Sequence, residues 1–153
     1  MKQKNTIIVT GSSGGIGSVI TKKLFECQYD VFGIDINSIT NPSLENFIKI
    51  DLNKLCIDNE YRNEKLKKIK KIIKNKKVTG IINCAAVQIV KEFDKISLDD
   101  LQISINTNVL SNFVLVQELK KYFYDRDSFI INISSIHSKL TKSKFLPYSF
   151  SKS

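Results

Sequence analysis

The stretch T-I-I-V-T-G-S-S-G-G-I-G, residues 6–17, decides the fold of this 153-residue chain. Its first five residues are a short apolar, β-branched run of the kind that forms buried strands. Four closely spaced glycines follow, and from Ile16 onward apolar residues recur at helical intervals: Ile16, Val19, Ile20, Leu24 and Phe25. We therefore predict a buried strand, a glycine-rich turn and a helix, in that order.

Glycine has a separate physical role at three positions of this turn. Gly11 allows a tight turn out of the strand, Gly15 lets the backbone approach a pyrophosphate, and Gly17 lets the helix pack close to the sheet. The helix N-terminus then presents unpaired N–H groups and a partial positive charge to the phosphates. The turn therefore predicts a dinucleotide site, with these candidate contacts: Thr10, Gly11, Ser13, Gly15, Ile16 and Gly17.

The rest of the chain continues the alternation of strands and helices. Further strands are expected at 30–35, 47–51, 78–85 and 128–134, with helices at 60–77 and from Ser97 to about Tyr122. Ser97 and Asp100 form a capping-box pattern, and residues 36–46 predict a loop with at most a short helix. The strands read as buried on both faces. We therefore expect an α/β fold, a Rossmann-type doubly wound parallel sheet of about five strands, with residues 1–153 forming one domain.

The composition limits the classes of partner. The 24 Lys and Arg against 15 Asp and Glu give a net charge of +9. Only Arg62 and Arg126 are arginines, so we interpret the lysines as solvated side chains and expect no nucleic-acid partner. Three scattered cysteines and a single histidine, His137, predict neither a disulfide framework nor a metal site, and they suit the cytoplasm. No stretch is long and apolar enough to predict a membrane partner.

Two acidic residues follow the second and third expected strands. Asp35 lies 24 residues after Gly11, where a carboxylate can accept hydrogen bonds from the adenosine ribose hydroxyls. It would repel a 2′-phosphate, so the sequence favours NAD over NADP as the cofactor. Asp51, followed by Leu52, is placed to meet the adenine edge. A helix N-cap is an equally good interpretation of Asp51.

The pattern T-G-x-x-x-G-x-G, together with Tyr148 and Lys152 four residues apart, resembles the short-chain dehydrogenase/reductase family. The glycine spacing is similar to that of its compact NAD(P)-dependent branch. N-C-A-A (83–86) resembles the family's Asn-Asn-Ala-Gly: Asn83 and Ala85 match, while Cys84 and Ala86 depart from it. These matches extend the candidate cofactor site to Asn83 and Ala85, and to Tyr148 and Lys152.

Two further segments resemble the catalytic part of the family. T-N-V-L-S (107–111) is similar to a helix motif of Asn followed three residues later by Gly; Asn108 matches, Ser111 replaces the Gly, and Asn106 fits the register less well. Ser135 stands 13 residues before Tyr148, the spacing of the family's catalytic serine. The resemblance implies that Tyr148 is the general acid/base and that Lys152 favours its phenolate and holds the nicotinamide ribose. It also implies that Ser135 orients the substrate oxygen and that Asn108 holds a relay water.

The resemblance implies an enzyme that transfers hydride between the nicotinamide and a small alcohol or carbonyl substrate. Family members continue past this point, so we expect the C-terminal part of the fold to be absent and the 153-residue chain alone to turn over poorly. We also expect exposed apolar side chains on the fifth strand and around 109–119, and a homo-oligomer for the full-length form. The main alternative is a non-catalytic NAD-binding remnant or regulator. The spacing of Gly11 and Gly15 disfavours a nucleotide-sugar epimerase or dehydratase.

Overall fold

The computed structural model describes residues 3–38, 44, 46–124 and 127–153. Five strands form its sheet: β1 (Asn5–Thr10), β2 (Asp30–Asp35), β3 (Asn46–Lys49), β4 (Lys77–Asn83) and β5 (Phe129–Asn132). The α-helices are α1 (Gly15–Glu26), α2 (Leu52–Ile57), α3 (Asn59–Ile73), α4 (Leu98–Ile105), α5 (Ser111–Leu119) and α6 (Leu146–Lys152). A π-helical turn, Asn106–Leu110, joins α4 to α5, and 3₁₀ turns lie at Phe93–Lys95, Lys120–Tyr122 and Ile136–Ser138.

The sheet confirms the predicted architecture. Its strand order is β3-β2-β1-β4-β5, and all four strand pairs are parallel. Thr10 pairs with Ile34 on one side and with Asn83 on the other, and Asn83 pairs with Asn132. The carboxyl ends of these strands therefore meet at one edge. The strand order changes direction between β1 and β4, which is where open α/β sheets bind their ligands.

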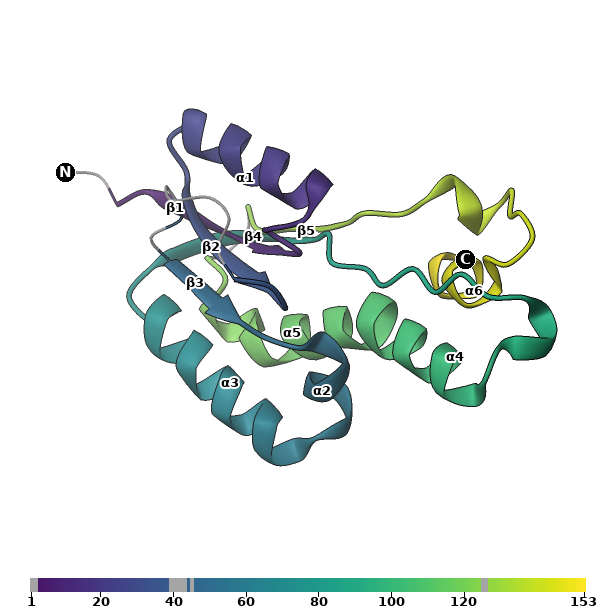
Figure 1. The fold of residues 1–153 in the computed structure, drawn as a ribbon. Coiled ribbons are helices and arrows are strands. Elements are labelled where there is room, and N and C mark those ends of the chain that lie inside the picture. The colour runs from purple at the N-terminus through teal and green to yellow at the C-terminus, as the bar shows by residue number, and fades with distance from the viewer. Residues whose placement is uncertain (1–2, 39–43, 45, 125–126) are drawn as a thin grey trace.

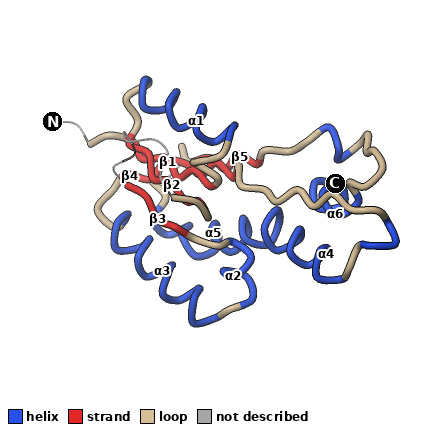
Figure 2. The backbone as a smooth tube through the Cα atoms, viewed as in Figure 1, coloured by secondary structure: helices blue, strands red, loops and turns tan. Residues whose placement is uncertain are grey.

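Helices cover both faces of the sheet (Figure 2). On one face α2, α3 and α5 pack over β1, β2 and β4, and their apolar side chains form the larger core, which includes Ile8, Phe32, Ile69 and Leu115. On the other face α1 packs alone among the described helices (Figure 1). The central strands β1, β2 and β4 are buried on both faces, as expected for near-continuous apolar runs in a parallel sheet.

The buried side of α1 is formed mainly by small residues. Gly17 and Thr21 are the buried residues of this helix, and Ile20 and Leu24 pack partly against the core. Three of the apolar residues whose spacing predicted the helix are exposed: Ile16 (60%), Val19 (67%) and Phe25 (37%). Close approach of the helix to the sheet requires small residues at the contact, so the glycine and the threonine mark the inner face better than the larger apolar side chains do.

The two edge strands are less buried than the central strands. β5 leaves Ile130 and Ile131 about half exposed, and β3 is only partly covered. The expectation that the strands are buried on both faces is therefore wrong for the edge strand β3, whereas the exposed apolar side chains of β5 agree with the expectation for the fifth strand. Val109 and Phe113 on the adjoining helical segment are also exposed, which confirms the expected apolar surface beside β5.

Several boundaries shift from their predicted positions. β3 ends at Lys49 and β4 at Asn83, and α3 ends at Ile73. The predicted helix after Ser97 has the expected capping box but contains the π-helical turn. Part of the predicted loop, residues 39–43 and 45, lies outside the described residues. In the described part of the chain, no helix is both long and apolar enough to cross a membrane.

Candidate functional site

Close backbone packing explains the glycines at positions 11 and 17. Gly11 has φ +68°, and its N–H donates to the carbonyl of Ile34 at 2.7 Å. A Cβ at Gly11 would lie 2.7 Å from the Cα of Ala85, and a Cβ at Gly17 would lie 2.0 Å from the carbonyl oxygen of Gly11. Both positions therefore exclude any side chain, and the helix is held directly against the turn.

Gly15 differs from these two glycines because its side-chain position faces open space. Apart from its chain neighbours and the adjoining backbone of α1, no atom of the described residues lies within 4 Å of a Cβ built there. Gly14, the N-cap of α1, provides no side-chain cap, and the first turn has no acidic residue. The N–H groups at the start of this 12-residue helix thus have no side-chain cap, and the absence of a side chain at Gly15 leaves open space beside them. These features fit a pyrophosphate.

Thr10 connects the turn to the end of β4. Its Oγ1 accepts hydrogen bonds from the N–H groups of Cys84 and Ala85, each at 3.1 Å. The side chain is fully buried. Thr10 therefore holds the segment after β4 beside the glycine turn. This is the segment whose backbone lies so close to Gly11 that a side chain at position 11 would not fit.

Asp35 lies at the end of β2 and is almost buried. One carboxylate oxygen accepts from the N–H of Ser13 at 2.8 Å, and the other accepts from the N–H of Asn37 at 2.9 Å. The carboxylate thereby fixes the glycine turn relative to β2. Each oxygen keeps a second lone pair, so these bonds leave acceptor capacity for ribose hydroxyls.

Asp51 and Leu52 have structural roles of their own. Asp51 is the N-cap of α2, and its Oδ1 accepts from the N–H groups of Asn53 and Lys54. Leu52 is buried in the larger core. The N-cap interpretation of Asp51 is therefore what the structure displays, and a contact with adenine stays a prediction.

Asn83 ends β4 at the carboxyl edge with only 2% of its surface exposed. Its Nδ2 donates to Oδ1 of Asn132 at 2.7 Å. Its own Oδ1 is buried and has no hydrogen-bond partner among the described residues. A buried amide oxygen without a donor is costly, so this edge has capacity for a ligand or water that donates a hydrogen bond.

Asn108 joins three segments from within the π-helical turn. Its Oδ1 accepts from the N–H of Val87 at 2.8 Å, and its Nδ2 donates to the carbonyl of Val87 at 3.0 Å. The same Nδ2 donates to Oγ of Ser151 at 2.7 Å. Asn106 faces elsewhere and donates to Oδ1 of Asn53, so of the two asparagines Asn108 is the one beside α6.

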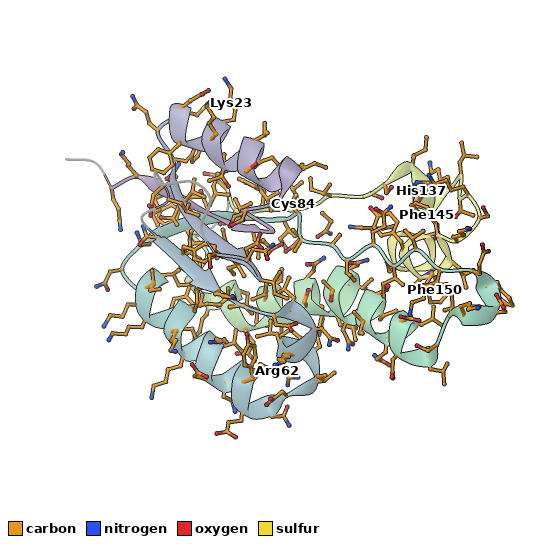
Figure 3. The ribbon with its side chains drawn as sticks, viewed as in Figure 1. Lys23, Arg62, Cys84, His137, Phe145 and Phe150 are labelled. Carbon is orange, nitrogen blue, oxygen red and sulfur yellow. The ribbon has the colours of Figure 1, made fainter. Side chains whose placement is uncertain are left out.

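The rings near α6 gather around His137. Oγ of Ser135 accepts from the His137 N–H at 3.2 Å, which caps the short 3₁₀ turn. The His137 ring stacks on Phe145 with centroids 4.9 Å apart, and it meets the Tyr148 ring edge-on at 6.1 Å. Figure 3 shows His137 and Phe145 side by side next to α6. His137 thus connects Ser135 to Tyr148, although their spacing alone does not reveal a role for it.

Lys152 is anchored at the end of β5. Its Nζ donates to the carbonyl of Ile133 at 2.8 Å and lies 6.0 Å from the centroid of the Tyr148 ring. Burial lowers the pKa of the Lys152 ammonium, and the nearby Cys84 partly opposes that shift. Burial also raises the pKa of the Cys84 thiol; the charge of Lys152 opposes this shift, and Asp35 adds to it.

The described residues contain no group of three or more His, Cys, Asp or Glu side chains that could hold a metal ion. Three residues near the site lacked a sequence signal of their own. Val87 acts through its backbone, and His137 and Ser151 act through contacts between segments. The only sequence signal for Ser151 is that it directly precedes Lys152.

Comparison with known protein families gives a match over almost the whole chain. The family model described as short chain dehydrogenase matches residues 5–153. An uncharacterized oxidoreductase of Saccharomyces cerevisiae is 25% identical over 159 residues, covering 99% of this chain and 49% of that protein. A 3-oxoacyl-[acyl-carrier-protein] reductase of Rickettsia conorii is 32% identical over 139 residues, covering 86% and 54%. The chain thus spans about half the length of these curated relatives.

Solved structures show the same arrangement of strands and helices. A short chain dehydrogenase family protein from Francisella tularensis aligns with a TM-score of 0.81 at 25% identity, covering 97% of this chain and 58% of that one. An oxidoreductase from Brucella ovis, solved in complex with a partially ordered NAD, aligns with a TM-score of 0.84 at 20% identity, covering 98% and 72%.

Proposed function

Because this chain belongs to the short-chain dehydrogenase family, we propose that it provides the dinucleotide site and catalytic side chains of an NAD-dependent oxidoreductase. The reaction is hydride transfer between a nicotinamide and a carbon bearing a hydroxyl or carbonyl group. The observation that carries the proposal is the open space at Gly15, at the uncapped start of α1, two residues after Ser13, whose N–H bonds to the carboxylate of Asp35.

The adenine half of the cofactor follows from this geometry. The N–H groups at the start of α1 bind the pyrophosphate, and the turn from Thr10 to Gly17 surrounds it. Asp35 accepts the ribose hydroxyls and disfavours a 2′-phosphate, so NAD is the preferred cofactor. Asp51 and Leu52 lie at the adenine side, and Asn83 and Ala85 line the floor beneath the dinucleotide.

The reacting half uses the residues around α6. The nicotinamide, when bound, accepts or supplies the hydride. Tyr148 takes the proton from the substrate hydroxyl in oxidation and returns it in reduction. Ser135 hydrogen-bonds the substrate oxygen, Lys152 holds the nicotinamide ribose, and Asn108 supports a water that connects Lys152 to solvent. The 6.0 Å between Nζ of Lys152 and the Tyr148 ring supports this assignment.

The remaining proposals concern the wider protein. We propose that residues 1–153 are a single dinucleotide-binding unit, and that the substrate is a small alcohol or carbonyl compound. The three cysteines are free, which suits the reducing cytoplasm. The exposed Val109 and Phe113 support a homo-oligomer of the full-length form.

A second candidate is a non-catalytic NAD-binding protein. It is favoured by the difference between the two halves of the site: the glycine turn rests on buried backbone, whereas α6 is held by single side-chain hydrogen bonds and exposes Phe150. NADH binding without turnover of any alcohol or carbonyl substrate by the full-length form would support this candidate over the enzyme.

The test is titration of the purified chain with NADH and NADPH, followed by intrinsic NADH fluorescence, in wild type and Gly15→Ala. The added Cβ meets no protein atom, so the melting temperature should stay within about 2 °C of wild type, while NADH affinity should fall about tenfold or more. Asp35→Ala should reduce the preference for NADH over NADPH. Equal NADH affinity in wild type and Gly15→Ala would contradict the proposed pyrophosphate position.

A further inference from the structure

We propose that Ser151 is a positioning residue that holds α6, and with it Tyr148 and Lys152, in register with Asn108. The inference rests on the proposed function, because its consequence is the placement of the residues assigned there to the nicotinamide half of the site. Ser151 itself is not assigned to touch substrate or cofactor.

The hydroxyl of Ser151 connects two of the proposed site residues. It accepts a hydrogen bond from Nδ2 of Asn108 at 2.7 Å and donates to the carbonyl of Tyr148 at 2.8 Å. Asn108 and Ser151 are 4% and 8% exposed, so water does not compete strongly for these groups. A hydroxyl has one proton, and here that proton is committed to Tyr148. The Ser151 oxygen therefore acts only as an acceptor toward Asn108, which fixes the direction of the hydrogen bond from the Asn108 amide.

Asn108 is itself fixed at the other end of this connection. Both the N–H and the carbonyl of Val87 bond to its amide, at 2.8 and 3.0 Å. Val87 lies four residues after the end of β4, next to the segment that Thr10 holds beside the glycine turn. The chain of hydrogen bonds thus runs from the floor of the cofactor site through Asn108 and Ser151 to Tyr148.

The other side-chain hydrogen bonds of this C-terminal segment reach only nearby sequence. Ser149 bonds to Thr141, Lys152 to Ile133 and Ser153 to Ser138. Among the described residues, Ser151 makes the hydrogen bond that ties α6 to an element preceding β5. This tertiary hydrogen bond therefore helps to set where α6 lies relative to Asn108.

The matched control for Ser151 is Ser149, on the same helix and similarly buried at 7% exposure. Its hydroxyl bonds to Thr141, within the loop that precedes α6. Alanine at either position removes one buried hydroxyl group and its hydrogen bonds, so both variants should lower the melting temperature by about 2–5 °C. Only Ser151→Ala should disturb the register between α6 and Asn108.

The first measurement is the affinity of each variant for NADH and for ADP, which lacks the nicotinamide ribose. Ser151→Ala should weaken NADH binding about three- to tenfold and leave ADP binding within about twofold of wild type. Ser151→Thr, which keeps the hydroxyl, should restore NADH affinity, and Ser149→Ala should retain it. Unchanged NADH affinity in Ser151→Ala, or an equal loss in Ser149→Ala, would overturn the proposal.

The second measurement is a double-mutant cycle between Ser151→Ala and Asn108→Ala, read by thermal unfolding without nucleotide. Ser151→Ala should lower the melting temperature less than half as much in the Asn108→Ala background as in wild type. Equal shifts in the two backgrounds would show that the two side chains are not coupled, and would overturn the proposal. Because this cycle needs no cofactor, a wild-type chain that fails to bind NADH would reject the proposed function while the cycle still decides the role of Ser151.

Discussion

The glycine turn and helix α6 form the two halves of the candidate site, and different forces hold them. Backbone contacts fix the turn: Gly11 and Gly17 leave no room for a side chain, and the turn lies between β1 and β4, which are buried on both faces. Side-chain hydrogen bonds between distant segments fix α6, which stands beyond the carboxyl ends of the strands (Figure 1). Substitutions at the surface should therefore leave the position of the glycine turn unchanged, whereas the loss of a single hydrogen bond should alter the position of α6.

This difference shows why the two halves have different sequence signatures. A backbone that must pass close to another backbone demands glycine at fixed spacing, which one local stretch reveals. A side chain that meets another across 43 residues, as Asn108 meets Ser151, leaves no local pattern. The following changes test how far the contrast between the halves holds.

The largest effect is expected from Gly17→Ala, which places a side chain where α1 contacts the glycine turn. The new Cβ would lie 2.0 Å from the carbonyl oxygen of Gly11, and that oxygen belongs to the turn itself. The free energy of unfolding should fall by about 3 kcal/mol or more, measured by chemical denaturation. Gly15→Ala is the matched control, because open space surrounds its Cβ and stability should be retained. Alanine raises helix propensity at both positions, so similar losses in the two variants would contradict the backbone contact as the source of the cost.

A medium effect is expected from Thr10→Val, a change of nearly equal volume. It leaves the buried N–H groups of Cys84 and Ala85 without their acceptor, so the free energy of unfolding should fall by about 2 kcal/mol. Thr21→Val is the control, since Oγ1 of Thr21 is equally buried but has no hydrogen-bond partner among the described residues. That variant should be neutral or more stable. Equal destabilisation of the two variants in a thermal melt would argue against the Thr10 contacts.

The smallest effect is expected from changing the pH dependence of stability at Asp100, in the first turn of α4. This helix packs against α6. The hydrogen bond from Lys91, followed by that from the Ser97 backbone, lowers the pKa of Asp100. The unfolded chain therefore takes up this proton first as the pH falls. The carboxylate contributes stability above its unfolded pKa, and the contribution is lost as the pH drops through the lower folded value.

Asp100→Asn should accordingly reduce the difference in melting temperature between neutral and acidic pH. The neighbouring Asp99, exposed in the same first turn of α4, provides the control, and Asp99→Asn should keep the wild-type profile. An unchanged profile for Asp100→Asn would show that the capping box and Lys91 do not contribute to acid sensitivity.

The sequence predicted elements well where local chemistry is strong. The strand Asp30–Asp35 and the capping box of Ser97 and Asp100 appear as predicted. Helix α2 was not predicted, because six residues are too few to show a helical period. Its ends depend on Asp51 at the start and on Arg62, which donates to the carbonyls of Leu55 and Cys56 near the end. Helix α1 was predicted from its apolar residues, but its inner face could not be read from them, because close packing against the sheet selects small residues.

The sequence by itself determined the order of strands and helices, the glycine turn and the family to which the chain belongs, because each depends on residues that are neighbours in the chain. Only the tertiary structure decided that Asn108 contacts α6 while Asn106 contacts Asn53, and that Thr10 holds the segment after β4. It also decided that Ser151 connects Asn108 to the carbonyl of Tyr148. The reason is physical: a hydrogen bond between segments depends on where the sheet and its helices place them, and the parallel sheet brings to one edge residues that lie far apart in sequence.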